Sequence, residues 1–211
     1  MRKIIAGWLA GIWLCLLLVR LPVQAANLAE PIQAQAYVLM EQESGTVLAE
    51  EQADVPLPMG MMAKLMTVLL AAEQLESGAW TLETVLTASD VVNTCEGATI
   101  WLTAGETMTV SDLLKAVIIG NANDAAAVLA EGVSGSVPAF VMEMNARAFD
   151  LGMHQTIFTN PQGYDDEKQC TTARDLAKLC QRLAEYETLQ PYFQTCRDFL
   201  RGEATELVNE N

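Results

Sequence analysis

Two residues that stand one helical turn apart define a possible reactive centre in this sequence. Met61 and Lys64 lie within the stretch Pro58–Thr67, and side chains at this spacing share one face of a helix. A lysine placed in this way beside a hydroxyl is a known arrangement for activating a serine nucleophile. Here a thioether occupies the place of the hydroxyl, and methionine sulfur has no proton to lose. The spacing therefore indicates a nucleophile-bearing helix without its nucleophile.

A β-hairpin followed by several helices is expected to position these residues. The expected strands are 36–40 and 46–49, with a turn at Glu43-Ser44-Gly45; the expected helices begin and end near 60–76, 109–120, 124–133, 137–150 and 172–186. Short extended pieces are expected at Val85–Thr87 and Thr99–Leu102. The pattern weakens after Glu187, and no closing element is expected in residues 203–211. This order predicts an α+β domain, in which a two-stranded hairpin alone would be marginally stable.

The first 25 residues have the features of a secretory signal peptide. Arg2 and Lys3 precede the uncharged apolar run Ile4–Val19, and small residues follow, so cleavage is predicted after Ala25. An uncleaved membrane anchor is the alternative, although the run is shorter than the ~20 residues that span a bilayer. We therefore expect a secreted, extracytoplasmic protein of the cell envelope.

The composition restricts the classes of partner and cofactor. With 211 residues, 51% of them hydrophobic, the chain can bury one ordinary core, and a net charge of −15 argues against nucleic acid as a partner. His154, the single histidine, is expected at the surface or in a loop. Cys95, Cys170, Cys180 and Cys196 fit no zinc-binding pattern, so neither a metal nor a cofactor is expected. Outside the cytoplasm these cysteines could pair in any of three connectivities.

A series of short stretches resembles the serine-type D-alanyl-D-alanine carboxypeptidases, the low-molecular-mass penicillin-binding proteins that trim peptidoglycan stem peptides. The stretches follow the order of the family and cover roughly residues 33–186. They are Ser44-Gly45, Pro58–Thr67, Gly105-Glu106, Asn123–Ala126, Leu129–Glu131, Met144-Asn145, Leu151–Met153, Asn160–Gly163 and Thr172–Asp175.

The resemblance implies a fold like that of the penicillin-binding proteins and serine β-lactamases, the transpeptidase fold, in an incomplete form. A helical subdomain and an N-terminal β-hairpin are expected to be present, and the C-terminal strands are expected to be missing. The expected organisation is a signal peptide in residues 1–25 and a carboxypeptidase-like domain in residues 26–211, truncated before the strand that carries Lys-Thr-Gly.

The family uses three motifs, Ser-x-x-Lys, Ser-x-Asn and Lys-Thr-Gly. The resemblance places Met61 at the nucleophile position, Lys64 at the general-base position, Asn121 at the second-motif serine and Asn123 at the second-motif asparagine. In the family the first serine attacks the D-Ala-D-Ala carbonyl, the lysine takes its proton, and the second motif orders the proton path and holds the substrate. No serine here has a lysine three residues later, and no lysine precedes Thr-Gly.

These substitutions predict a catalytically inactive relative, because removal of a catalytic serine costs on the order of 10⁶ in kcat. Three interpretations stay open: a non-catalytic binder of the peptidoglycan stem peptide or a partner enzyme, a truncated gene product without an independent role, and an active carboxypeptidase. Lys64 and Asn123 could equally persist as packing residues of an inherited fold. A partner chain that supplies the missing strands is a further expectation.

Overall fold

The computed structural model describes residues 32–209, and everything below concerns the unit that begins at Gln33. The predicted signal peptide and its cleavage site lie outside the described residues. The helices and 3₁₀ turns are η1 Gly60–Met62, α2 Ala63–Glu76, η2 Asp90–Thr94, α3 Val110–Ile118, α4 Asn123–Ser134, α5 Val137–Asp150, α6 Ala173–Ala184, η3 Glu187–Leu189 and α7 Gln190–Phe193. The strands are β1 Tyr37–Met40, β2 Val47–Glu51, β3 Leu57–Pro58, β4 Val85–Thr87, β5 Thr107–Thr109, β6 Cys170–Thr171, β7 Arg197–Leu200 and β8 Thr205–Val208.

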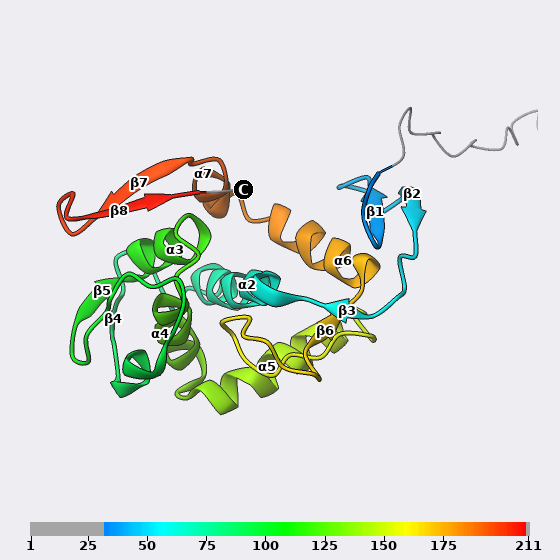
Figure 1. Cartoon of the computed structure of the whole chain (residues 1–211). Helices are drawn as coiled ribbons and strands as arrows, with labels where there is room; N and C mark the ends of the chain where they lie inside the picture. The colour runs from blue at the N-terminus through cyan, green and yellow to red at the C-terminus, as the bar shows by residue number, and fades with distance from the viewer. Residues whose placement is uncertain (1–31, 210–211) are drawn as a thin grey trace, which may run out of the picture. The chain divides into compact units, whose positions relative to one another are not determined.

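The described strands form four separate antiparallel pairs: β1 with β2, β3 with β6, β4 with β5, and β7 with β8. The helices gather between these pairs, with α2 in the middle and α3, α4, α5 and α6 around it (Figure 1). The expected α+β class is therefore confirmed. Among the described residues no single helix is long and apolar enough to cross a membrane; α4 and α5 would pass only as a pair, and that pair is bent by 80°.

Helix α4 is the most deeply buried element of this unit. Every side chain from Asn123 to Ala130 is buried, and the helix contacts α2, α3 and α5. Four of these eight residues are alanines, whose small side chains let the neighbouring helices approach closely. The helix ends at Gly135, which adopts the left-handed conformation common after a helix C-terminus. This close packing fixes the position of the residues just before α4, which include the predicted second motif.

Side-chain caps set the beginnings of three helices. The hydroxyl of Thr109 accepts the N–H of Asp112 at 3.1 Å, so α3 begins where the capping pattern predicts. Ser136 caps α5 through the N–H of Ala139, and Thr172 caps α6 through the N–H of Asp175. Helix α5 has the bounds predicted from the sequence. Local chemistry thus decides these boundaries before tertiary packing is considered.

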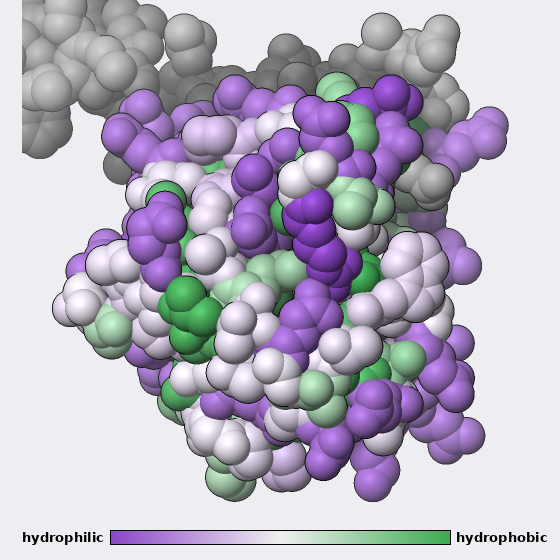
Figure 2. All heavy atoms as spheres, turned by 90° about the vertical axis from the view of Figure 1, so that its left-hand side faces the viewer, coloured by the Kyte–Doolittle hydropathy of each residue, from purple (hydrophilic) through white to green (hydrophobic). Residues whose placement is uncertain are grey.

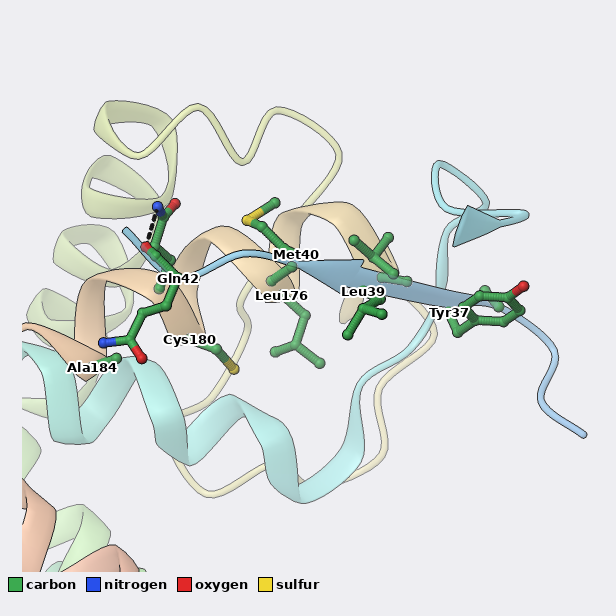
Figure 3. Close-up of a pocket in the computed structure, with 12 residues that line it drawn as sticks. Tyr37, Leu39, Met40, Gln42, Leu176, Cys180 and Ala184 are labelled. Atoms are coloured by element: carbon green, nitrogen blue, oxygen red, sulfur yellow. Dashed lines mark hydrogen bonds between the residues drawn. The ribbon is translucent and has the colours of Figure 1, made fainter. Parts of the chain in front are cut away.

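The N-terminal hairpin forms as predicted, and it packs on α6. The carboxylate of Glu41 accepts hydrogen bonds from the N–H and hydroxyl of Ser44, which closes the turn. An apolar groove of about 520 Å³ separates β1 from α6, and Leu176 and Cys180 of α6 line it opposite Met40 (Figure 3). The groove touches consecutive residues of β1 and none of β2, so it follows the edge of β1 that β2 leaves open.

Two parts of the structure differ from the prediction. Thr99–Leu102 is not a strand, because a buried carboxylate takes the N–H groups of Ile100 and Leu102 that a strand would offer to a neighbour. The pair β7–β8 was not predicted; its turn at residues 201–204 contains two non-glycine residues with positive φ, Arg201 and Glu203. Such turns carry no common sequence signal, since positive φ favours glycine.

The histidine lies where the sequence predicts, and the cysteines in the described part of the chain are not paired. His154 is exposed in a loop after α5, as expected, with its ring 5.2 Å from that of Phe149. The four cysteines between residues 32 and 209 are unpaired, so none of the three possible pairings forms in this structure.

Candidate functional site

The predicted nucleophile and base positions lie where η1 runs directly into α2. Met61 is in η1 and 55% exposed, whereas Lys64 is in the first turn of α2 and only 5% exposed. The buried part of α2 begins with its first residues, Ala63 and Lys64, whereas Met61 and Met62 of the preceding turn η1 are exposed to solvent. The thioether therefore stands at the mouth of a site whose floor contains the lysine.

Lys64 is bound by a turn that lies almost a hundred residues later in the chain. Its ammonium donates to the carbonyl oxygen of Gln162 at 2.6 Å, and the hydroxyl of Thr67, one turn along α2, donates to that of Pro161 at 3.1 Å. Burial lowers the pKa of Lys64 to about 8, because removal of water disfavours the charged form. The lysine is thus mostly protonated at neutral pH and acts as a donor within this contact.

Gly163 allows that turn to approach the site. Its φ is +86°, and a Cβ at this position would lie 2.2 Å from the carbonyl oxygen of Gly60 and 2.9 Å from the Cα of Met61. The side chain of Asn160 holds the turn by accepting the N–H groups of Gly163 and Tyr164 at 2.7 and 2.8 Å. Backbone therefore packs directly on backbone beside the nucleophile position, which only glycine permits.

The two substituted motif positions meet each other. Asn121 has a φ of +53°, a conformation that asparagine tolerates better than most residues, and its amide Nδ2 lies 3.8 Å from the sulfur of Met61 in a weak hydrogen bond. The left-handed residue turns the chain from α3 into α4, so the buried helices on both sides place it at the mouth of the site. The structure thus brings the side chains of Met61 and Asn121 together, and their motif roles stay predictions.

Asn123, the retained second-motif asparagine, faces a different neighbour. Its Nδ2 donates to the carbonyl oxygen of Glu96 at 2.6 Å, and its backbone N–H donates to that of Ala98 at 2.7 Å. Its buried Oδ1 has no hydrogen-bond partner among the described residues. The thiol of Cys95 donates to the backbone carbonyl oxygen of Asn123 at 3.8 Å, and burial raises the pKa of that thiol. Lys64 and Asn123 therefore contact the loops on either side of the site and make no hydrogen bond with each other.

A cleft of about 340 Å³ opens at the junction of α2, α3 and α7. Its lining residues are Met61, Met62, Lys64, Leu65, Val68, Val117, Ile118, Asn121, Phe193 and Asn209. None of these ten residues carries a hydroxyl, and Lys64 is the one charged residue among them. The cleft is an apolar cavity with an ammonium group and two side-chain amides.

Sequence reasoning missed several residues of this site. Phe193 and Asn209 line the cleft from a segment in which no element was expected, and no periodic pattern points to them. Gln162 contacts Lys64 through its backbone carbonyl, and the type of its side chain gives no indication of this contact. The turn Asn160–Gly163 was expected as a turn, but its contact with α2 depends on the tertiary fold.

Comparison with known proteins shows what this arrangement is similar to. A family profile described as "D-alanyl-D-alanine carboxypeptidase" matches residues 23–211. The D-alanyl-D-alanine carboxypeptidase DacF of Bacillus subtilis is 35% identical over 182 residues, which are 85% of this chain and 47% of that protein. DacC of Escherichia coli is 36% identical over 157 residues, 72% of this chain and 39% of that protein. The chain thus spans about half or less of the length of these curated relatives.

Solved structures agree with the sequence comparison. The D-alanyl-D-alanine carboxypeptidase DacD of Francisella tularensis superposes with a TM-score of 0.80 at 26% identity, covering 89% of this chain and 45% of that one. Penicillin-binding protein 5 of Haemophilus influenzae superposes with a TM-score of 0.78 at 28% identity, covering 87% of this chain and 54% of that one. The fold is that of the penicillin-binding proteins, and the chain belongs to the D-alanyl-D-alanine carboxypeptidase family.

Proposed function

We propose that this protein is a non-hydrolysing relative of the carboxypeptidases that binds the D-Ala-D-Ala end of a peptidoglycan stem peptide without forming an acyl-enzyme. The observation that carries the proposal is the lining of the cleft, which has no hydroxyl and has the sulfur of Met61 at its mouth. An acyl ester needs an oxygen nucleophile that can give up a proton, and a thioether has none.

The groups around Met61 support the same conclusion. Burial lowers the pKa of Lys64 to about 8, which suits a general base, but its ammonium donates to the carbonyl of Gln162, and no residue that lines the cleft has a hydroxyl from which it could take a proton. Asn121 offers an amide in place of a hydroxyl, and an amide cannot relay a proton as a serine can. Neither proton transfer of the family's reaction is therefore available from these side chains.

Binding requires less than catalysis, and the cleft retains suitable groups. A buried ammonium attracts the terminal carboxylate of a peptide, and the Asn121 amide can donate to a peptide carbonyl or accept from a peptide N–H. The apolar walls suit the methyl groups of D-alanine, and a volume of about 340 Å³ falls within the usual range for small-molecule sites. Lys64 and Asn121 are the proposed contacts.

The proposed location is outside the cytoplasm. The support is the pattern of residues 1–25, with a basic start, an apolar run and small residues before Ala26. Membership of a family of D-alanyl-D-alanine carboxypeptidases agrees with this location, because peptidoglycan stem peptides lie in the cell wall.

The test is to titrate the protein with diacetyl-L-Lys-D-Ala-D-Ala by calorimetry while release of free D-alanine is followed. We expect saturable binding, no release of D-alanine, and a loss of about tenfold in affinity for Lys64→Met, since a charge-assisted contact is removed. Lys115→Met is the matched control, because Lys115 lies on α3 in an ion pair with Asp198. Release of D-alanine would establish an active carboxypeptidase, and absence of binding would favour a gene product without an independent role.

A further inference from the structure

Trp101 is presented to solvent in an unusual backbone conformation. Its side chain is 78% exposed, the highest value among the exposed large hydrophobic residues of the described chain, and its φ is +56°. Aromatic residues rarely adopt positive φ, and strained residues of this kind cluster at ligand-binding sites. The residues on either side, Ile100 and Leu102, are buried. The chain therefore anchors both neighbours and turns the indole outward.

A buried carboxylate fixes this presentation from beneath. Asp124, in the first turn of α4, accepts the N–H of Leu102 at 2.9 Å and that of Ile100 at 3.2 Å. From the other side Arg201, in the β7–β8 turn, donates to the carbonyl of Ile100 at 2.8 Å. Both peptide groups that flank Trp101 are thus held by charged side chains, and the ring is pre-organised before any ligand arrives.

The loop that carries Trp101 also holds Asn123, one of the predicted site residues. The carbonyls of Glu96 and Ala98 accept both hydrogen bonds of Asn123, and Ala98 precedes Trp101 by three residues. Because an extended chain advances at most ~3.5 Å per residue, the Cα of Trp101 lies within about 10 Å of the Cα of Ala98. Trp101 therefore lies on the loop whose carbonyls accept the hydrogen bonds donated by Asn123, the predicted second-motif asparagine.

The surroundings of Trp101 point to a particular kind of ligand. Its exposed neighbours in the loop, Glu96, Ala98 and Thr103, are polar or small. The face that carries β4, β5 and the end of the β7–β8 pair is largely hydrophilic, with hydrophobic residues in separate spots (Figure 2). A protein-docking surface would need a contiguous apolar patch. A single rigid aromatic ring among polar groups suits a sugar ring, whose C–H face stacks on the indole while its hydroxyls stay hydrated.

We propose that Trp101 is a stacking platform for an N-acetylated sugar of the peptidoglycan glycan strand, a contact that rests on the proposed binding of stem peptides. The peptide end of the ligand occupies the cleft beside Lys64, and the glycan to which the peptide is attached passes over the loop at residues 96–103. Recognition of the peptide and of the sugar is then divided between the cleft and the loop that carries Trp101.

The test is a calorimetric titration of the full chain with peptide-free N-acetylglucosaminyl-N-acetylmuramic acid. We expect binding to the wild-type protein and a loss of about tenfold or more in Trp101→Ala, with most of the affinity kept in Trp101→Phe. Phe149→Ala is the matched control, because Phe149 is also a strongly exposed aromatic residue but lies on α5. Trp101→Gly, which tolerates positive φ, should fold at least as stably as the wild type and still lose the sugar.

The possible results separate this contact from the proposed function. Affinity for diacetyl-L-Lys-D-Ala-D-Ala should be unchanged in the Trp101 variants. The affinity for the disaccharide can therefore be interpreted even if the protein does not bind the peptide. Equal disaccharide binding by Trp101→Ala and the wild type, or no disaccharide binding by the wild type, would overturn the proposal. Trp101-dependent binding to phosphatidylcholine vesicles without binding of the disaccharide would also overturn it, in favour of a membrane contact.

Discussion

Helix α4 and the β1–β2 hairpin show two different ways of holding a segment in this protein. The eight residues of α4 from Asn123 to Ala130 are all buried among other helices, whereas no residue of β1 or β2 is fully buried. Leu39 in β1 is 43% exposed, and the open edge of that strand borders the groove in Figure 3. The helical part of the unit therefore carries most of the burial, and the hairpin is attached to it through α6.

Buried helices fix the position of the candidate site. Met61 and Asn121 are at the surface, but each is joined to a buried helix, α2 or α4, whose packing leaves little freedom of position. The predicted motif positions at the mouth of the site hold a thioether and an amide, while the framework beneath them fits the family's fold with a TM-score of 0.80. Stability and reactivity are thus carried by different residues, and the following variants test this separation.

The largest effect is expected in the core of α4. Leu129→Ala should lower the free energy of unfolding by about 3–5 kcal/mol, because Leu129 is completely buried and its loss leaves a cavity. Leu39→Ala, the matched change in β1, should cost less than about 1 kcal/mol, since much of that side chain is already in water. Urea denaturation of both variants measures the difference. Equal losses would mean that the hairpin belongs to the same cooperative core.

Asp124→Ala should lower the free energy of unfolding by about 3 kcal/mol. The carboxylate accepts the N–H groups of Ile100, Leu102 and Ala125, and its removal leaves buried donors without partners. Asp124→Asn keeps a hydrogen-bond acceptor and should lower the free energy of unfolding by about half as much. Denaturant unfolding gives the stability, and hydrogen exchange should show faster exchange at Ile100 and Leu102 in the alanine variant. Unchanged exchange at these two amides would contradict the anchoring of the Trp101 loop.

The sequence predicted the parts of this fold that local chemistry decides. The hairpin turn at Ser44-Gly45, the cap at Thr109 and the bounds of α5 all follow from residues close together in the chain. The Thr99–Leu102 prediction was wrong because the partner of its N–H groups, Asp124, lies more than twenty residues away. A hydrogen bond between residues this far apart leaves no periodic pattern in the sequence.

The candidate site also combines residues that the sequence predicted with contacts that depend on the tertiary fold. Spacing and family resemblance were enough to choose Met61, Lys64, Asn121 and Asn123, and their roles stay predictions. The contact that buries Lys64, a carbonyl of residue 162, could not be predicted because it is a backbone group brought in by the tertiary fold. The β7–β8 pair was missed since its turn depends on Arg201, which is held in a left-handed conformation by bonds to Glu106 and Ile100.

An effect of about 3 kcal/mol, spread over a range of pH, is expected from the burial of Lys64. Its pKa is about 8 in the folded protein and 10.5 in the unfolded chain, so between these values the unfolded state binds more protons. Stability should therefore rise with pH from about 8 to 10.5, relative to Lys64→Met, as the buried charge is lost. Urea denaturation of both proteins across this range measures the difference. A difference that stays constant with pH would show that the ammonium is fully solvated.

The proposed function requires that the nucleophile position does not support acylation, and intact-protein mass spectrometry after incubation with benzylpenicillin measures this. We expect no added mass on the wild-type chain, and none on Met61→Ser, because Asn121 still replaces the second-motif serine and Lys64 still donates to Gln162. Adduct on Met61→Ser alone would show that the remaining groups are competent and that the missing hydroxyl is the single defect. A covalent penicilloyl adduct on the wild-type protein would contradict the account.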